Sequence, residues 1–454
     1  MRHYPIIVAV IAVFIASACT KSPKLPETFI KGTVTVADSL DDSGDFSGIG
    51  ITIITRDSTN AKNDTLFHKI TEKSGYFEGE VQFPEKRYYS LFISRNERDL
   101  GTIAVILAED DTVTINAQLP DINESLTLNS REHEAMDTFR RVDRSFQRVG
   151  MYARSGAIPD SLLLDEVKKW SDLYWEVFEK HENTIAAYLA AEKSANLLNS
   201  WNPDEMLKRI DKALPEDYMF SVALDLGQPY IAETKGFEAA SNYLDSLSQI
   251  ANNETVREVI EREKIKMYFD SSRVKEAKKL LNDYEANYHD KPSSKKWTRR
   301  IRYDLNYLAP GVNVPDFNFV TMLGDTVNNR VLENDVYILE FSPLANAEYQ
   351  NDYDRTLIIH EIYKNYGLKI FTIPLDQSEI TVNAFFDERR KVWPIAKIGT
   401  FDVQDIIQKF NVVQVPTRFL IDKNGVIIRK YERGEFEDVI QGINRAFSNT
   451  NSPS

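Results

Sequence analysis

Cysteine and histidine, the residues that most often supply redox groups and transition-metal ligands, are few in this chain. Cys19 is the only cysteine among 454 residues, so the chain can form no internal disulfide. His360-Glu361 begins like the His-Glu-x-x-His motif of zinc proteases, but Lys364 stands where the second histidine is required. The six histidines are scattered, at His3, His68, His133, His181, His289 and His360. The sequence therefore predicts no metal site and no cofactor.

The surroundings of Cys19 are specific. An uncharged apolar run of 13 residues, Ile6–Ala18, follows a short basic start, and this length fits a signal peptide better than a membrane span. Ala16-Ser17-Ala18-Cys19 resembles a bacterial lipobox. This resemblance implies a signal peptide over residues 1–18, acylation of Cys19 and a lipidated tether over residues 19–27. An ordinary secretory signal with a leftover cysteine is the alternative.

An acyl anchor at Cys19 would attach the protein to a membrane of the cell envelope. We expect the outer membrane, with the chain facing the periplasm and an envelope protein as partner. The net charge is -14 and the pI about 5.1, and no basic stripe is evident in the sequence. Nucleic acid is therefore not an expected partner.

The stretch from Val412 to Ile427 has the most informative local pattern. Its two β-rich runs flank Asn424-Gly425, a pair that predicts a type I′ hairpin turn with positive φ at both residues. Pro416 has no backbone N–H, so we expect it at the first residue of a strand or in a turn. Residues 415–425, Val-Pro-Thr-x-Phe-Leu-Ile-Asp-x-x-Gly, resemble the same segment of the thioredoxin-like superfamily, in particular its envelope-tethered TlpA/ResA-type branch.

This resemblance covers roughly residues 314–447, about the last third of the chain. It implies an α/β thioredoxin-like fold. It also implies a cis peptide bond between Val415 and Pro416, next to the position of the redox site. Val415, Pro416 and Thr417 are therefore the candidate binding residues of a groove beside that bond.

Redox-active members of the family have a Cys-x-x-Cys pair after a buried strand, at the start of a helix. The matching strand here is Val336–Phe341, and no cysteine follows it. When the sequences are aligned on the acid-Phe pair that ends this strand, Asn346 and Tyr349 occupy the two cysteine positions. A slip of one residue would place Ala345 and Glu348 there instead.

Three functional hypotheses follow. The first is a non-catalytic, redox-inactive lipoprotein whose thioredoxin-like module has a binding or scaffolding role. The second is a thiol-disulfide oxidoreductase or peroxidase of cell-envelope redox homeostasis, which needs a thiolate that the chain lacks. The third is an unrelated enzymatic activity in the reused cleft. Glu340 aligns with a buried acid that some thioredoxins use as a proton relay; without cysteines, we expect a structural, hydrogen-bonded or edge-exposed glutamate.

The pattern of apolar residues predicts a multidomain chain. Residues 28–128 alternate apolar and polar positions between short turns, which predicts an antiparallel β-sandwich. Residues 129–310 have helix caps and apolar residues spaced three and four apart, which predicts a helical domain. Two similar segments, 236–240 and 273–277, are compatible with tetratricopeptide-like hairpins, with an irregular bundle as the alternative. The thioredoxin-like domain follows at 311–448, before a tail at 449–454.

Overall fold

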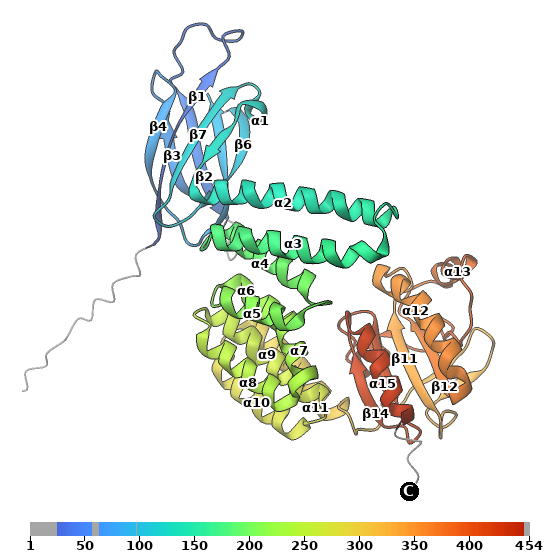
Figure 1. The fold of residues 1–454 in the computed structure, drawn as a ribbon. Coiled ribbons are helices and arrows are strands. Elements are labelled where there is room, and N and C mark those ends of the chain that lie inside the picture. Colours follow the sequence, from blue (N-terminus) through green and yellow to red (C-terminus); the bar gives the residue numbers. More distant parts are fainter. Residues whose placement is uncertain (1–24, 57–62, 97, 449–454) are drawn as a thin grey trace, which may run out of the picture. The chain divides into compact units, whose positions relative to one another are not determined.

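The computed structural model describes residues 25–56, 63–96 and 98–448, with the elements labelled in Figure 1. The chain forms two compact units, one ending at Gly227 and the other beginning at Gln228. This boundary falls inside the helical domain predicted for residues 129–310, so its helices are divided between the two units. The predicted signal peptide, Cys19 and the tail at 449–454 lie outside the described residues.

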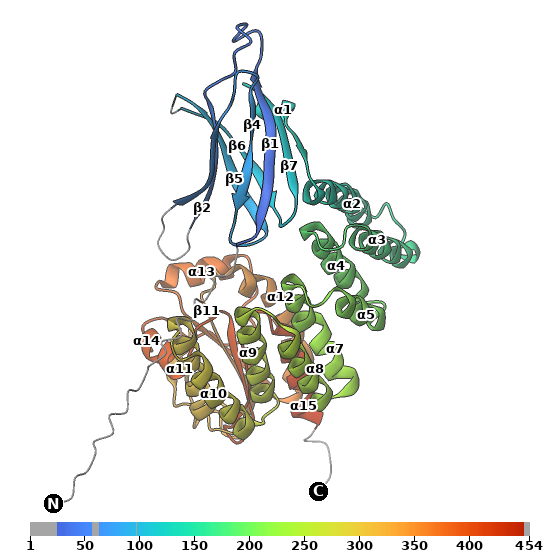
Figure 2. The ribbon, with the colours of Figure 1, turned by 90° about the vertical axis from the view of Figure 1, so that its left-hand side faces the viewer.

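The first unit begins with a β-sandwich of two four-stranded sheets, ordered β4-β1-β7-β8 and β3-β2-β5-β6 (Figures 1 and 2). Every second residue of β1 is buried, and Ile30 and Val34 join Ile51 and Leu91 of the other sheet in one apolar core. The strands are β1 (Glu27–Val36), β2 (Ile49–Arg56), β3 (Asn63–Ile70), β4 (Tyr76–Gln82), β5 (Arg87–Arg95), β6 (Arg98–Leu107), β7 (Thr112–Leu119) and β8 (Thr127–Asn129).

The prediction that this sandwich is antiparallel is wrong for one pair of strands. β1 and β7 pair in parallel, from Phe29 opposite Thr112 to Val36 opposite Leu119. A parallel pair needs a long connection, and the five strands between β1 and β7 along the chain provide it. Alternating apolar residues identify a strand, but they do not specify the direction in which distant strands pair.

Helices complete the first unit. α2 (Arg131–Arg154) begins after Ser130, whose side chain accepts a hydrogen bond from the backbone N–H of His133 at 3.3 Å. α3 (Asp160–Lys180) runs back along α2 to form a helical hairpin (Figure 1). The remaining helices are α1 (Ile122–Ser125), α4 (Ile185–Leu198), α5 (Pro203–Ala213) and α6 (Asp217–Val222), followed by a π-helical turn (Ala223–Gly227).

The second unit begins with five helices, each of which packs on the next. Leu281, Tyr284 and Leu305 are buried in the apolar core that α9, α10 and α11 share. The helices are α7 (Gln228–Lys235), α8 (Phe237–Ile250), α9 (Glu254–Asp270), α10 (Val274–Tyr288) and α11 (Pro292–Tyr307).

A four-stranded sheet with the order β12-β11-β13-β14 follows. β11 (Val336–Ser342) pairs in parallel with β12 (Leu368–Pro374) and antiparallel with β13 (Thr417–Ile421), which pairs antiparallel with β14 (Ile427–Tyr431). The other elements are β9 (Asn318–Val320), β10 (Thr326–Asn328), α12 (Ala347–Tyr363), a 3-10 turn (Lys364–Tyr366), α13 (Glu379–Asp387), α14 (Val403–Lys409) and α15 (Phe436–Ser448).

Both faces of this sheet are covered by apolar side chains. From β11, Leu339 and Phe341 enter the core on one face, and Ile338 enters the core on the other. β13 behaves in the same way, with Phe419 on one side and Leu420 on the other. The near-continuous apolar sequence of β11 is therefore that of a strand buried on both faces, as predicted.

The hairpin predicted around Asn424-Gly425 is present, but the predicted type I′ turn is wrong. Gly425 has a φ of +74°, whereas Asn424 is not among the residues with positive φ. The side chain of Asp422 accepts hydrogen bonds from the backbone N–H groups of Asn424 at 2.8 Å and Val426 at 2.9 Å. This aspartate organises a longer loop, so a positive φ is needed only at the glycine.

Candidate functional site

The pairing of β11 with β13 brings the two predicted parts of the site to one edge of the sheet. Phe341, near the end of β11, lies opposite Thr417, the first residue of β13. The loop that leads from β11 to α12 therefore lies at the same edge as the residue before Thr417. The peptide bond between Val415 and Pro416 is cis, as the family resemblance implies.

Asn346 is the N-cap of α12. Its side-chain oxygen accepts a hydrogen bond from the backbone N–H of Tyr349 at 2.9 Å, so it satisfies one of the free N–H groups at the helix start. Ala345 precedes the cap and is exposed. The alignment without a slip thus places Asn346 at the helix start, where a redox cysteine gains thiolate character. The side chain found there is a structural cap.

Tyr349, which the alignment without a slip places at the second cysteine position, is only 1% exposed. Its hydroxyl lies 3.1 Å from Oγ1 of Thr372, which donates to Oε2 of Glu340 at 3.0 Å. The indole N–H of Trp393 donates to the same Oγ1 at 2.9 Å. Burial raises the pKa of Tyr349 well above its usual value, so the phenol stays protonated and its hydroxyl remains a hydrogen-bond donor.

Glu340 is a buried, fully bonded side chain, in accord with the structural alternative. Its Oε1 accepts from Nε of Arg418 at 2.8 Å, while Thr372 occupies its other oxygen. Arg418 also forms an ion pair with Asp352, with Nη1 and Oδ2 3.1 Å apart. Burial raises the pKa of Asp352, although the nearby guanidinium of Arg418 opposes this effect. Both oxygens of Glu340 are therefore hydrogen-bonded within the fold.

The predicted groove residues are mostly enclosed. Pro416 and Thr417 are buried, and Val415 is half-buried. The hydroxyl of Thr417 donates to the backbone carbonyl of Gln414 within its own loop. The side chains that face solvent lie just upstream, since Gln414 is exposed and Val413 is 53% exposed. A partner at this loop would therefore contact residues that the sequence pattern did not select.

A cavity of about 480 Å³ lies beside Val413. It has the size of a ligand site, and its lining is apolar and cationic. We call it the α11 cleft; its lining residues are Ser293, Lys296, Trp297, Arg299, Arg300, Tyr303, Gln408, Asn411 and Val413. The lining contains three cations and no carboxylate. α11 lies more than a hundred residues upstream of Val413, so no local sequence motif could have indicated this cleft.

The cations of the cleft are not equivalent. Arg300 forms an ion pair with Glu432. Lys296 and Arg299 are exposed, and within the described residues neither has a hydrogen-bond or ion-pair partner. Two positive charges are therefore open to a ligand at the rim of an apolar cavity.

Buried polar contacts attach the loop before Pro416 to α11. The side-chain amide of Asn411 donates to the carbonyl oxygen of Arg300 at 3.1 Å and to Oδ1 of Asp304 at 2.8 Å. Lys430 and Asp304 are each 3% exposed, with Nζ and Oδ2 3.0 Å apart. The hydrogen bonds of Asn411 therefore join the two sides of the α11 cleft, and a buried charge pair links α11 to β14.

Among the described residues, no cluster of three or more histidine, cysteine or acidic side chains has the spacing of a metal site. None of the helices in that part of the chain is both long enough and apolar enough to cross a membrane.

The strand order, the parallel β11-α12-β12 unit and the β13–β14 hairpin followed by α15 define a thioredoxin-like fold in the last third of the chain. No family model matches the sequence. The chain is 25% identical over 140 residues to a thiol-disulfide oxidoreductase ResA of Bacillus cereus, covering 31% of this chain and 79% of the relative. It is 30% identical over 81 residues to a ResA of Bacillus thuringiensis subsp. konkukian, covering 17% and 44%.

Solved structures with a similar fold are also described as thiol:disulfide interchange proteins. A putative thiol:disulfide interchange protein DsbE from Chlorobium tepidum is 22% identical, with a TM-score of 0.28 over 30% of this chain and 97% of that chain. A thiol:disulfide interchange protein from Bacteroides sp. is 20% identical, with a TM-score of 0.27 over 30% and 91%. The present chain has Cys19 as its only cysteine.

Proposed function

We propose that this chain is a redox-inactive thioredoxin-like lipoprotein of the cell envelope that binds a partner protein. The observation that carries the proposal is the nature of the two cysteine positions. Asn346 caps α12 with its side chain, and Tyr349 is buried in a hydrogen-bonded network. Disulfide exchange requires a thiolate that attacks a sulfur and forms a mixed disulfide. Neither side chain can supply that sulfur.

The two enzymatic alternatives have less support. A thiol-disulfide oxidoreductase or peroxidase would need both sulfurs from another molecule. An unrelated enzyme would need a nucleophile or a general acid–base group. No histidine, carboxylate or cysteine lines the α11 cleft, so these roles would fall to Ser293, Lys296 and Tyr303. Cations beside aromatic side chains are instead suited to recognition.

The lining of the α11 cleft indicates the chemistry of the partner. Trp297 and Tyr303 supply aromatic surface, and Lys296 and Arg299 supply unpaired positive charge. The complementary ligand is an acidic segment of an envelope protein that carries an apolar side chain for the cavity. The lipobox resemblance at Cys19 supports attachment to the outer membrane, facing the periplasm, where such a partner would be met.

Site-specific photo-crosslinking tests this binding role. A photoreactive residue in place of Val413 is expected to capture a specific envelope protein. The control is the same residue in place of Ile380 on α13, which is also apolar and exposed, at 79% against 53% for Val413. Lys296→Glu combined with Arg299→Glu should abolish the product at Val413. Equal capture from both positions, or a product that is insensitive to the charge reversal, would contradict the proposal.

A further inference from the structure

The exposed face of α2 is strongly basic in the C-terminal part of the helix. The segment from Arg140 to Arg154 contains five arginines and a single carboxylate, Asp143. Arg141, Arg144 and Arg148 are three and four residues apart, so they lie on one face of the helix, and all three are exposed. The expectation that the chain has no basic stripe is corrected here, because only the helical arrangement brings these arginines together.

These three arginines are not neutralised. Arg141 and Arg148 donate to the hydroxyls of Thr138 at 3.2 Å and Ser145 at 3.3 Å, within their own helix. Arg144 donates to the carbonyl oxygen of Arg140. No carboxylate of the described residues forms an ion pair with any of them. Their charges are therefore available to an external anion.

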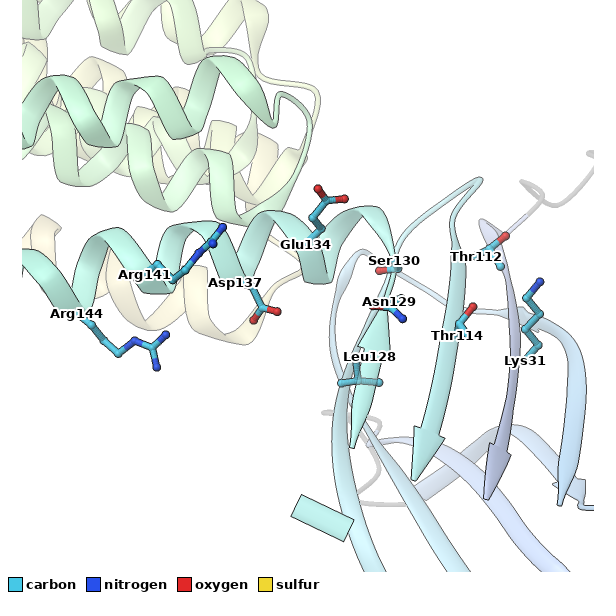
Figure 3. Close-up of a pocket in the computed structure, with 10 residues that line it drawn as sticks. All are labelled: Lys31, Thr112, Thr114, Leu128, Asn129, Ser130, Glu134, Asp137, Arg141 and Arg144. Carbon is cyan, nitrogen blue, oxygen red and sulfur yellow. The ribbon is translucent and has the colours of Figure 1, made fainter. Parts of the chain in front are cut away.

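Acidic residues occupy only the part of this face nearest the sandwich. Glu134 and Asp137 precede Arg141 and Arg144 along α2, as Figure 3 shows. With Lys31 of β1, these four residues line an open cavity of about 860 Å³ between the sandwich and α2. The charge on the helix therefore changes sign with distance from the sandwich, and the tip of the hairpin is the cationic end.

Apolar side chains follow the arginines at the tip of the α2–α3 hairpin. Met151 and Tyr152 are 55% and 59% exposed and continue the same helix face. On α3, Leu162 and Leu164 are 49% and 58% exposed, although the acidic Asp165 lies beside them. Exposed apolar residues next to a cationic face form the pattern of a helix that lies at a membrane interface.

We propose that the basic face of α2, defined by Arg141, Arg144 and Arg148 together with Met151 and Tyr152, binds the surface of an anionic lipid membrane. The arginines pair with lipid phosphates, and the two apolar side chains enter the headgroup region. A nucleic acid could pair with the arginines, but it offers no apolar layer for Met151 and Tyr152. The presence of both cationic and apolar side chains therefore favours a lipid surface.

The position of α2 fits attachment near Cys19, and this part of the argument rests on the proposed lipid anchor. Thr28, next to the first residue of β1, donates to the backbone oxygen of Asp111 at 2.7 Å. The backbone N–H of Arg131, the first residue of α2, donates to Oδ1 of the same aspartate at 3.4 Å. α2 therefore begins beside the point where the tether joins the sandwich. The proposed tether over residues 19–27 has nine residues and spans at most about 32 Å, and α2 is about 36 Å long.

Vesicle co-sedimentation of the chain that begins at Thr20 tests the proposal. This chain keeps every described residue but cannot be acylated at Cys19, so the result is independent of the proposed anchor and of the redox assignment. We expect binding to vesicles of phosphatidylcholine mixed with phosphatidylglycerol, and much weaker binding to phosphatidylcholine alone. Removal of three interfacial charges by Arg141→Gln, Arg144→Gln and Arg148→Gln should weaken binding on the order of a hundredfold.

The matched control removes three exposed or partly exposed lysines of α10, by Lys275→Gln, Lys278→Gln and Lys279→Gln. It changes the net charge equally and should leave vesicle binding unchanged. Circular dichroism verifies that both variants fold. A second variant, Met151→Ser with Tyr152→Ser, should also weaken binding to the mixed vesicles. The proposal is overturned if the arginine variant binds like the control, or if the arginines are required only for binding to a nucleic-acid duplex.

Discussion

Glu340 and Arg418 lie directly opposite each other on β11 and β13 and form a buried ion pair. Nε and Oε1 are 2.8 Å apart, and the two side chains are 1% and 3% exposed. Removing two charges from water is offset only when the geometry is good and the remaining polar atoms are bonded. Thr372 and Asp352 supply further contacts here, whereas Nη2 of Arg418 is buried without a hydrogen-bond partner among the described residues. Glu340 is therefore part of a structural network.

This pair makes a prediction about stability. Arg418→Met should lower the free energy of unfolding by about 3–5 kcal/mol, because Glu340 and Asp352 would be left as buried carboxylates without a counter-ion. Arg433→Met is the control, since Arg433 pairs with Glu348 but its side chain is 66% exposed. The control should change stability by less than about 1 kcal/mol. Urea unfolding measures the free energy of unfolding of both variants. Equal losses would show that the buried ion pair stabilises the fold no more than the exposed pair does.

The assignment of the cysteine positions can be tested by restoring them. In the chain from Thr20, Asn346→Cys with Tyr349→Cys places two thiols three residues apart at the start of α12. Mild oxidant should close an intramolecular disulfide, seen as loss of both free thiols without dimer formation. Replacing the buried Tyr349 leaves a cavity, so this variant should be less stable by about 2–4 kcal/mol.

The matched variant is Ala345→Cys with Glu348→Cys, which has the same spacing but begins before the helix cap. It should close its disulfide less readily. Efficient closure in this variant, together with failure of the first pair, would mean that the alignment has to be shifted by one residue.

A pH dependence follows from Asp270 in α9. Burial raises the pKa of Asp270 to about 7, with Arg429 at 3.3 Å lowering it and Glu435 raising it. In the unfolded chain the ordinary pKa is 3.8. The folded state therefore holds a proton that the unfolded state has lost, and its stability falls as the pH rises from about 4 to about 7.

Asp270→Asn should remove that dependence, since the amide does not titrate. Relative to this variant, the native chain should lose up to about 4 kcal/mol of stability between about pH 4 and about pH 7. This figure follows from about 1.4 kcal/mol for each unit of pKa shift. Urea midpoints measured at several pH values for both chains provide the test. Parallel pH profiles would contradict the assignment of this group.

The proposed anchor gives a prediction in cells. Cys19→Ala removes the acylated side chain, so the protein should leave the membrane fraction after a high-salt wash. High salt screens the charges of the α2 arginines, so the wash also removes electrostatic attachment through α2. The wash therefore distinguishes the lipid anchor from the contact through α2. Continued membrane association of this variant after the wash would be incompatible with lipidation at Cys19.

Features formed by residues close together in the sequence could be predicted, whereas features formed by residues far apart in the sequence could not. β11 was predicted because a continuous apolar strand is a contiguous pattern, and the cis bond before Pro416 was implied by the family resemblance of the segment around that proline. That Asn346 stands at a cysteine position stays a prediction, since the structure shows only that this residue caps α12. The parallel pairing of β1 with β7 and the α11 cleft were not predicted, since each joins residues far apart in sequence. The arginine face of α2 was missed because a net charge of -14 conceals a local excess of positive charge.

The central claim is that the thioredoxin-like part does not exchange disulfides. Insulin reduction by the chain from Thr20 measures this directly, because that chain contains no cysteine. We predict a rate equal to the buffer background, while Asn346→Cys with Tyr349→Cys provides a dithiol control in the same fold. Reductase activity above background in the cysteine-free chain would contradict the account.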